Sequence, residues 1–203
     1  MTKLVFAVIT CFVFIACNNT NKTPGQKDMP NMTMDSTKKV FDSTPVPEIA
    51  HSFSVDPKLT VSIKTIVNQY LQIKNALVNN SGSEAAKSGK AMAETISKMD
   101  TSLFTTEQKK IYDGLEEDLK ENAEHIGKSG GDIDHQREHF VMMSEDIYDL
   151  VKAFGSGQTL YQDYCPMAND DKGATWLSET KEVKNPYFSG NMNECVKVQN
   201  MIK

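Results

Sequence analysis

The apolar residues between positions 57 and 157 recur every three or four residues, which is the period of an amphipathic helix. Breaks rich in asparagine, serine and glycine at 79–82 and 129–131, together with the helix-start signal at Thr105, divide this region into four stretches. The pattern predicts four helices: from Pro57 to the Asn79–Gly82 break, about 83–99, from Thr105 to the Ser129–Gly131 break, and about 132–154. The longest apolar stripe, in the fourth helix, contains Ile133, Gln136, Phe140, Met143, Ile147, Leu150, Val151 and Phe154.

Signals for helix starts lie where the periodicity requires them. Asp56-Pro57 combines an N-cap residue with a proline suited to the first turn, and Thr105-Thr106-Glu107 resembles a capped start. Short breaks favour antiparallel neighbours, and a body of about 100 residues has enough core to fold by itself. No strand pattern competes with this one. We therefore expect an all-α fold, an antiparallel four-helix bundle over residues 57–157.

Residues 158–203 have a different texture, rich in Asn, Asp, Gly, Pro and aromatic residues, with only short apolar runs. We expect a small irregular segment that completes the same domain. Trp176 and the pair Tyr187-Phe188 are its expected anchors on the bundle. Residues 195–198 suit either a short strand or the start of a terminal helix, and the sequence does not decide between them.

Residues 1–17 resemble a bacterial lipoprotein signal peptide. Lys3 precedes an apolar run, Leu4 to Ala16, that is too short to span a bilayer. The run ends in Ala16-Cys17, which resembles a lipobox and predicts lipidation of Cys17; an ordinary signal peptide with a chance cysteine is the alternative. A lipid would tether the protein to a membrane. The predicted location is periplasmic, anchored to the inner face of the outer membrane or the outer face of the inner membrane.

Residues 18–56 are predicted to be a disordered linker, because they contain many prolines and polar residues and no sustained apolar period. Met29, Met32 and Met34 lie within it. Thioethers outside a core are candidate ligands for Cu(I), although chance composition explains them as well.

Charge and motifs exclude several function classes. A formal net charge of −5 argues against nucleic acid as a partner. The chain has no glycine-rich phosphate loop, no nucleophile motif beside a base and no His-Glu-x-x-His zinc motif. We therefore predict that the protein is not an enzyme.

The strongest candidate chemistry lies in two mirrored spacings, Cys165-x-Met167 and Met192-x-x-Cys195. Thiolates and thioethers are soft donors that select Cu(I) or Ag(I) over hard cations. Pro166 fixes φ and stiffens the turn between the first pair. A disulfide between Cys165 and Cys195 is the alternative; it would close a loop of about 31 residues and contribute about 3 kcal/mol.

Histidines provide a weaker candidate. His135 and His139 are four residues apart on the fourth predicted helix, and Met142 follows on the same stripe. They could chelate a metal, or they could form part of an ordinary solvated face. His125 and His51 have no partner visible in the sequence.

Several motifs together resemble a domain family of unassigned function. They are His135-Gln136-Arg137-Glu138-His139-Phe140, Tyr164-Cys165-Pro166-Met167-Ala168, Trp176-Leu177-Ser178, Asn185-Pro186-Tyr187-Phe188 and Met192-x-x-Cys195. The family occurs in bacterial lipoproteins and at the C-terminus of periplasmic adaptor subunits of copper/silver efflux pumps. The resemblance implies a helical domain associated with copper handling. Ala168 departs from related Cys-Pro-Met modules, where a histidine usually follows the methionine.

The sequence thus predicts a membrane-tethered periplasmic protein that binds Cu(I) or Ag(I) and sequesters it or delivers it to a heavy-metal efflux complex. The alternative is a disulfide-stapled helical interaction module of the cell envelope that binds no metal.

Overall fold

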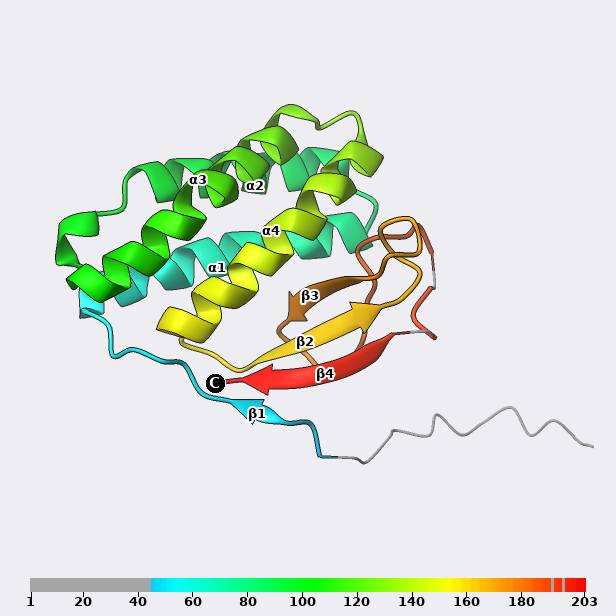
Figure 1. The fold of residues 1–203 in the computed structure, drawn as a ribbon. Coiled ribbons are helices and arrows are strands. Elements are labelled where there is room, and N and C mark those ends of the chain that lie inside the picture. Colours follow the sequence, from blue (N-terminus) through cyan, green and yellow to red (C-terminus); the bar gives the residue numbers. More distant parts are fainter. Residues whose placement is uncertain (1–44, 191, 195) are drawn as a thin grey trace, which may run out of the picture. The chain divides into compact units, whose positions relative to one another are not determined.

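The computed structural model describes residues 45–203 except 191 and 195. It contains helices α1 (Pro57–Val78), α2 (Gly82–Ser97), α3 (Thr106–Lys128) and α4 (Ile133–Phe154), with a short 3-10 turn η1 (Thr101–Leu103) before α3. The strands are β1 (Glu48–Ile49), β2 (Leu160–Cys165), β3 (Ala174–Ser178) and β4 (Lys197–Ile202) (Figure 1). Cys17, Met29, Met32, Met34 and Cys195 lie outside the described residues.

The four predicted helices are confirmed, and their predicted starts are capped. Asp56 accepts a hydrogen bond from the backbone N–H of Lys58 at 2.8 Å, with Pro57 in the first turn of α1. Thr105 and Gln108 form a reciprocal capping box at the start of α3. These local bonds explain why the helix starts could be located from the sequence.

The prediction of an all-α fold is wrong, because residues outside the bundle form a four-stranded mixed sheet in the order β1-β4-β2-β3. Strand β2 is antiparallel to both β3 and β4, whereas β1 is parallel to β4. Strand β2 lacks the alternation of apolar and polar residues that usually marks a half-buried strand in a sequence, because it buries the polar neighbours Gln162 and Asp163. The open question about residues 195–198 is settled in favour of a strand from Lys197 onward.

The part of the predicted linker that the structure describes, residues 45–56, lies along the folded domain. β1 pairs with β4, with Glu48 opposite Met201. The backbone N–H groups of Ser52 and Phe53 then donate to the carbonyl oxygens of Lys152 and Ala153 at the end of α4. This stretch therefore contributes both a strand and a helix-terminal contact.

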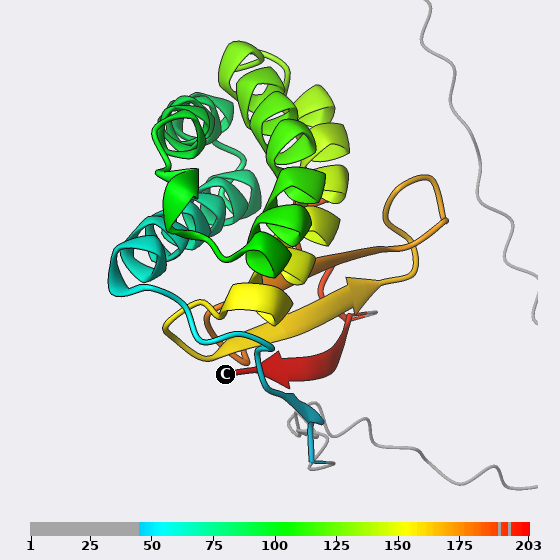
Figure 2. The same cartoon turned by 60° about the vertical axis from the view of Figure 1, so that its left-hand side comes forward.

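The sheet packs on α1 and α4, with β3 beside α4 and β1 at the far edge (Figures 1 and 2). Tyr70 of α1 stacks on Phe140 of α4, with ring centroids 5.0 Å apart. Its hydroxyl accepts from the backbone N–H of Leu177 at 3.0 Å and shares a hydrogen bond with the Ser144 hydroxyl at 2.9 Å. Trp176 of β3 is fully buried at this interface, as the sequence predicted for an anchor residue.

An ion pair between a buried lysine and a partly exposed glutamate joins α1 to the end of β3. The Lys74 ammonium lies 2.6 Å from the Glu179 carboxylate and also donates to the Ser178 hydroxyl at 3.3 Å. The Asn75 amide donates to the other Glu179 oxygen at 2.8 Å. Lys74 is almost entirely buried, and these bonds offset the free-energy cost of removing its charge from water.

Helices α2 and α3 approach closely at two glycines. A Cβ atom on Gly89 would lie 2.7 Å from the Ala123 carbonyl oxygen and 2.9 Å from the Gly127 nitrogen, both of them backbone atoms. On Gly127, a Cβ atom would lie 2.9 Å from the Lys90 side chain. Glycine at position 89 is therefore required by packing against α3, although it is a poor helix former.

We predict that Gly89→Ala lowers the free energy of unfolding by about 1–3 kcal/mol, because the added methyl overlaps backbone that cannot move away. The matched control is Gly114→Ala on α3, where nothing lies within 4 Å of the added atom. That variant should gain up to about 1 kcal/mol from helix propensity. Chemical denaturation measures both, and equal effects of the two substitutions would contradict the packing argument.

The carboxyl group of Asp163 is buried between the sheet and α1. Neither oxygen has a hydrogen-bond partner among the described residues. Burial raises the pKa of Asp163 from its ordinary value of 3.8 to about 7, and the nearby Lys74 opposes this only in part. The folded protein thus holds this proton more tightly than the unfolded chain, so stability decreases as pH rises from about 4 to about 7.

We predict that Asp163→Asn, which is neutral at every pH, raises the free energy of unfolding at about pH 8 by about 2–4 kcal/mol. The difference from the wild type should shrink towards about pH 3, where Asp163 is mostly protonated in both states. Urea denaturation across this pH range measures it, with the exposed Glu117→Gln as a carboxyl-to-amide control. Parallel pH profiles for wild type and Asp163→Asn would show that another group carries the dependence.

Candidate functional site

The Cys165-Pro166-Met167 turn begins where β2 ends. Cys165 is the last residue of β2, pairs with Ala174 of β3, and has a fully buried side chain. The Ala168 N–H donates to the Cys165 carbonyl at 3.4 Å, closing the turn. Met167 is 45% exposed. The two soft donors of this motif therefore face different surroundings, the thiol inside the domain and the thioether at its surface.

A left-handed loop returns the chain from this turn to β3. Asn169, Asp170 and Asp171 have φ values of 55°, 53° and 61°. Each left-handed residue with a Cβ atom costs about 1–2 kcal/mol, least for Asn and Asp. Gly173 follows with φ 84°, and the Tyr164 ring lies so close to it that a side chain would overlap the ring. The sequence Asn-Asp-Asp-Lys-Gly thus fits the tight return that positions Met167.

The second predicted motif is held against α4. The Asn185 side chain donates to the Met192 carbonyl at 3.0 Å and accepts from the Tyr187 N–H at 3.0 Å. Arg137 of α4, itself buried, donates from Nε to the Pro186 carbonyl at 3.0 Å. Met192 is 36% exposed. The Arg137 bond explains how the His135–Phe140 and Asn185–Phe188 motifs depend on each other.

Tyr187 lies where the two motifs meet. Its hydroxyl donates to the Thr175 carbonyl at 2.7 Å, and its ring packs edge-on against Trp176 with centroids 5.6 Å apart. Burial raises the pKa of Tyr187 well above its ordinary value, and Tyr70, Glu145 and Cys165 add smaller contributions in the same direction. Cys165 therefore lies near an aromatic wall built by β3 and the second motif.

A hollow of about 270 Å³ opens beside this wall. It is lined from the first motif by Met167 and from the second by Tyr187 and Phe188, with Glu138 and Val141 of α4 on the opposite side. Met167 of the first motif and the Asn185–Phe188 motif thus meet at one hollow, whereas Cys165 and Met192 are not among the residues that line it. Cys195 lies outside the described residues, so the proposed pairing with Cys165, by metal or by disulfide, stays a prediction.

The predicted histidine ligands lie elsewhere, on the α3–α4 hairpin. His135 and His139 of α4 are joined there by His125 of α3, and ligand atoms of all three lie within 4.8 Å of one another. Met142 is 47% exposed on α4. Sequence reasoning missed His125, although a short break at 129–131 between antiparallel helices places position 125 opposite 135 and 139.

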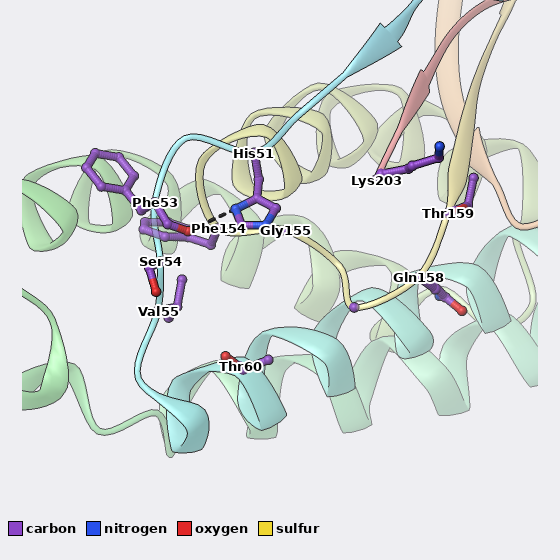
Figure 3. A pocket seen from close by; sticks show the side chains of 11 residues that line it. His51, Phe53, Ser54, Val55, Thr60, Phe154, Gly155, Gln158, Thr159 and Lys203 are labelled. Atoms are coloured by element: carbon purple, nitrogen blue, oxygen red, sulfur yellow. Dashed lines mark hydrogen bonds between the residues drawn. The ribbon is translucent and has the colours of Figure 1, made fainter.

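The fourth histidine, His51, lies in a separate hollow of about 410 Å³ beside the end of α4 (Figure 3). Its Nδ1 is 2.9 Å from the Phe53 carbonyl oxygen. Gly155, with φ 77°, leaves room for the ring: a Cβ atom there would be 3.1 Å from it. These contacts give His51 a structural role in seating residues 51–53 on α4.

Within the described part of the chain, every helix is too short or too polar to cross a membrane. This finding leaves the predicted lipid anchor at Cys17 untested.

Comparison with known proteins gives one match. Residues 66–159 match the model of a family described as "Protein of unknown function (DUF3347)". The matched span runs from within α1 to just before β2, so it contains all three histidines of the hairpin and excludes both Cys/Met motifs. The family's description does not mention lipoproteins or efflux adaptors. No curated protein matches the chain. No solved structure matches it either. Over its helices, this chain is therefore similar to a protein family of unknown function.

Proposed function

We propose that the protein binds a monovalent soft metal ion, Cu(I) or Ag(I), at the C-terminal segment. Cys165 and Met167 are the first pair of ligands, and Met192 and Cys195 are the second. The observation that carries the proposal is the meeting of the Cys165-Pro166-Met167 turn with the Asn185–Phe188 motif at one hollow. Met167 lines this hollow, and Cys165 lies two positions earlier in the same turn. Sulfur donors of this kind favour monovalent copper and silver.

The surroundings of Cys165 suit a metal-bound thiolate. An isolated thiolate in an apolar interior is costly, and a bound monovalent cation offsets that cost. Trp176 and Tyr187 are buried like Cys165 and pack against each other, and such buried aromatic surroundings limit access of water. An apolar shell of this kind controls the dielectric around a metal and protects Cu(I) from oxidation.

The exposure of the two thioethers suits exchange of the ion with a partner. Met167 and Met192 are both partly exposed, whereas Cys165 is enclosed. A thioether at the surface can capture the ion first, and the thiolate then holds it more tightly. Sequestration or delivery to an efflux complex fits such a graded site, and the lipobox at Cys17 would place it in the periplasm on a membrane.

The second candidate function is a disulfide-stapled interaction module of the cell envelope that binds no metal. The complete burial of the Cys165 side chain favours this alternative, because an enclosed sulfur suits a structural cross-link. Secreted proteins commonly contain such bonds.

We predict that the reduced protein competes with a chromophoric chelator for Cu(I), and that Cys165→Ser weakens its affinity by at least about tenfold because the thiolate is the strongest ligand. Met167→Leu, which keeps the side-chain volume, should weaken it less. Met142→Leu is the matched control, since Met142 is 47% exposed and Met167 45%. A wild type that does not compete, or a Cys165→Ser variant that competes equally well, would overturn the proposal.

Intact mass under non-reducing conditions separates the two candidates. A loss of two hydrogens that persists in protein purified from copper-loaded cells identifies the disulfide module. Full-mass protein that carries copper supports the metal site.

A further inference from the structure

Three of the four histidines of this chain lie together at one end of the α3–α4 hairpin. The rings of His125 and His139 stack with centroids 4.3 Å apart, and the His135 ring meets His139 edge-on at 4.6 Å. All three side chains are half-buried, so they form a shallow site that is open on one side. Three imidazoles in one place are more than a solvated helix face requires.

The hairpin fixes the relative positions of these rings. His125 lies in the last turn of α3, while His135 and His139 are one turn apart at the start of α4. Gln136, which lies between His135 and His139 in the sequence, is fully buried. It donates to the carbonyl oxygens of Ile126 at 3.0 Å and Gly82 at 2.9 Å. These two bonds fasten the start of α4 to α3 and α2. The backbone beneath the cluster is therefore rigid.

Neighbouring oxygens orient two of the rings for binding. His139 Nδ1 lies 2.9 Å from the Asn122 side-chain oxygen, and His135 Nδ1 lies 3.2 Å from a Glu138 carboxylate oxygen. An oxygen acceptor places the proton on Nδ1 and leaves the lone pair on Nε2. Metal-binding histidines usually donate their second N–H in this way.

The third ring has a weaker partner. His125 Nε2 lies 3.7 Å from the Glu121 carboxylate, which leaves Nδ1 available. Glu121 and Glu138 thus add one carboxylate from each helix, and these negative charges offset part of the charge of a bound cation.

The His139 ring is favoured in its neutral form. Burial lowers the pKa of His139, and the neighbouring His125 and His135 lower it further. Neutral imidazole is the ligand that a metal ion requires.

We propose that His125, His135 and His139 form a binding site for a divalent first-row transition-metal ion of the Zn²⁺ and Cu²⁺ class. Imidazole nitrogens suit these borderline ions, whereas Cu(I) and Ag(I) prefer sulfur. Nitrogens around a tetrahedral Zn²⁺ at about 2.0–2.1 Å lie about 3.4 Å apart, so the observed spread of up to 4.8 Å closes by small side-chain rotations. Three protein ligands leave the fourth position open to solvent.

This site shares no proposed ligand with the C-terminal site. It uses nitrogen instead of sulfur and lies on α3 and α4 instead of on the β2–β3 turn. Failure of one proposal therefore leaves the other standing.

Calorimetric titration of the full chain with ZnCl₂, and separately with CuCl₂, tests the proposal. We expect one ion per chain at micromolar or tighter affinity. His125→Asn and His139→Asn should each weaken binding by at least about tenfold, and Asn122→Ala by about tenfold through loss of ring orientation. His51→Asn is the matched control, because His51 lies in the separate hollow, and Cys165→Ser controls for binding by the thiol.

Two further readouts separate loss of a ligand from loss of fold. Zn²⁺ should raise the melting temperature of the wild type and of His51→Asn, and leave that of the folded His125→Asn unchanged. In nitrogen NMR of histidine-labelled protein, Zn²⁺ should shift Nε2 of His135 and His139 and leave His51 in place. Absence of Zn²⁺ and Cu²⁺ binding by the wild type, or equal weakening by His51→Asn, would overturn the proposal.

Discussion

The Tyr70 hydroxyl is the contact on which the position of the sheet depends. This one group is bonded to the Leu177 backbone N–H of β3 and to the Ser144 hydroxyl of α4, while the Tyr70 ring stacks on Phe140. Burial raises the pKa of Tyr70 above its ordinary value, so the group stays neutral. It therefore connects α1, α4 and β3 without burying a charge. Because β3 pairs with β2 up to Cys165, the Cys-Pro-Met turn inherits its position from this contact.

Local interactions could be predicted from the sequence, and interactions between distant residues could not. The helix starts at Asp56 and Thr105 were found because each cap bonds to a residue two or three positions away. The sheet was missed because β2 buries Gln162 and Asp163, and because β1 and β4 pair across most of the chain. The Cys/Met motifs could be identified from the sequence as candidate metal ligands. The hollow beside them could not, because it depends on the hydrogen bond from Arg137 to Pro186, 49 positions away.

Both candidate sites depend on the first turns of α4. Arg137 of this region donates to the Pro186 carbonyl, and Gln136 donates to carbonyl oxygens of α3 and α2. His135 and His139 lie beside His125 of α3. Four of the five residues 135–139 thus reach three different neighbours. A helix has the geometry for this, since successive side chains are about 100° apart around its axis. The Asp132 cap, which accepts from the His135 N–H at 3.1 Å, fixes where this turn begins.

The place of β4 between β1 and β2 sets an order of assembly. Each helix contacts mainly its neighbours in sequence, so the bundle can form before the strands pair. β1 and β2 have to wait for residues 197–202 before their facing edges are paired. The hairpin with three histidines can therefore form before the strand that carries Cys165 is paired on both sides. Enclosure of Cys165 between β3 and β4 thus belongs to the final stage of folding.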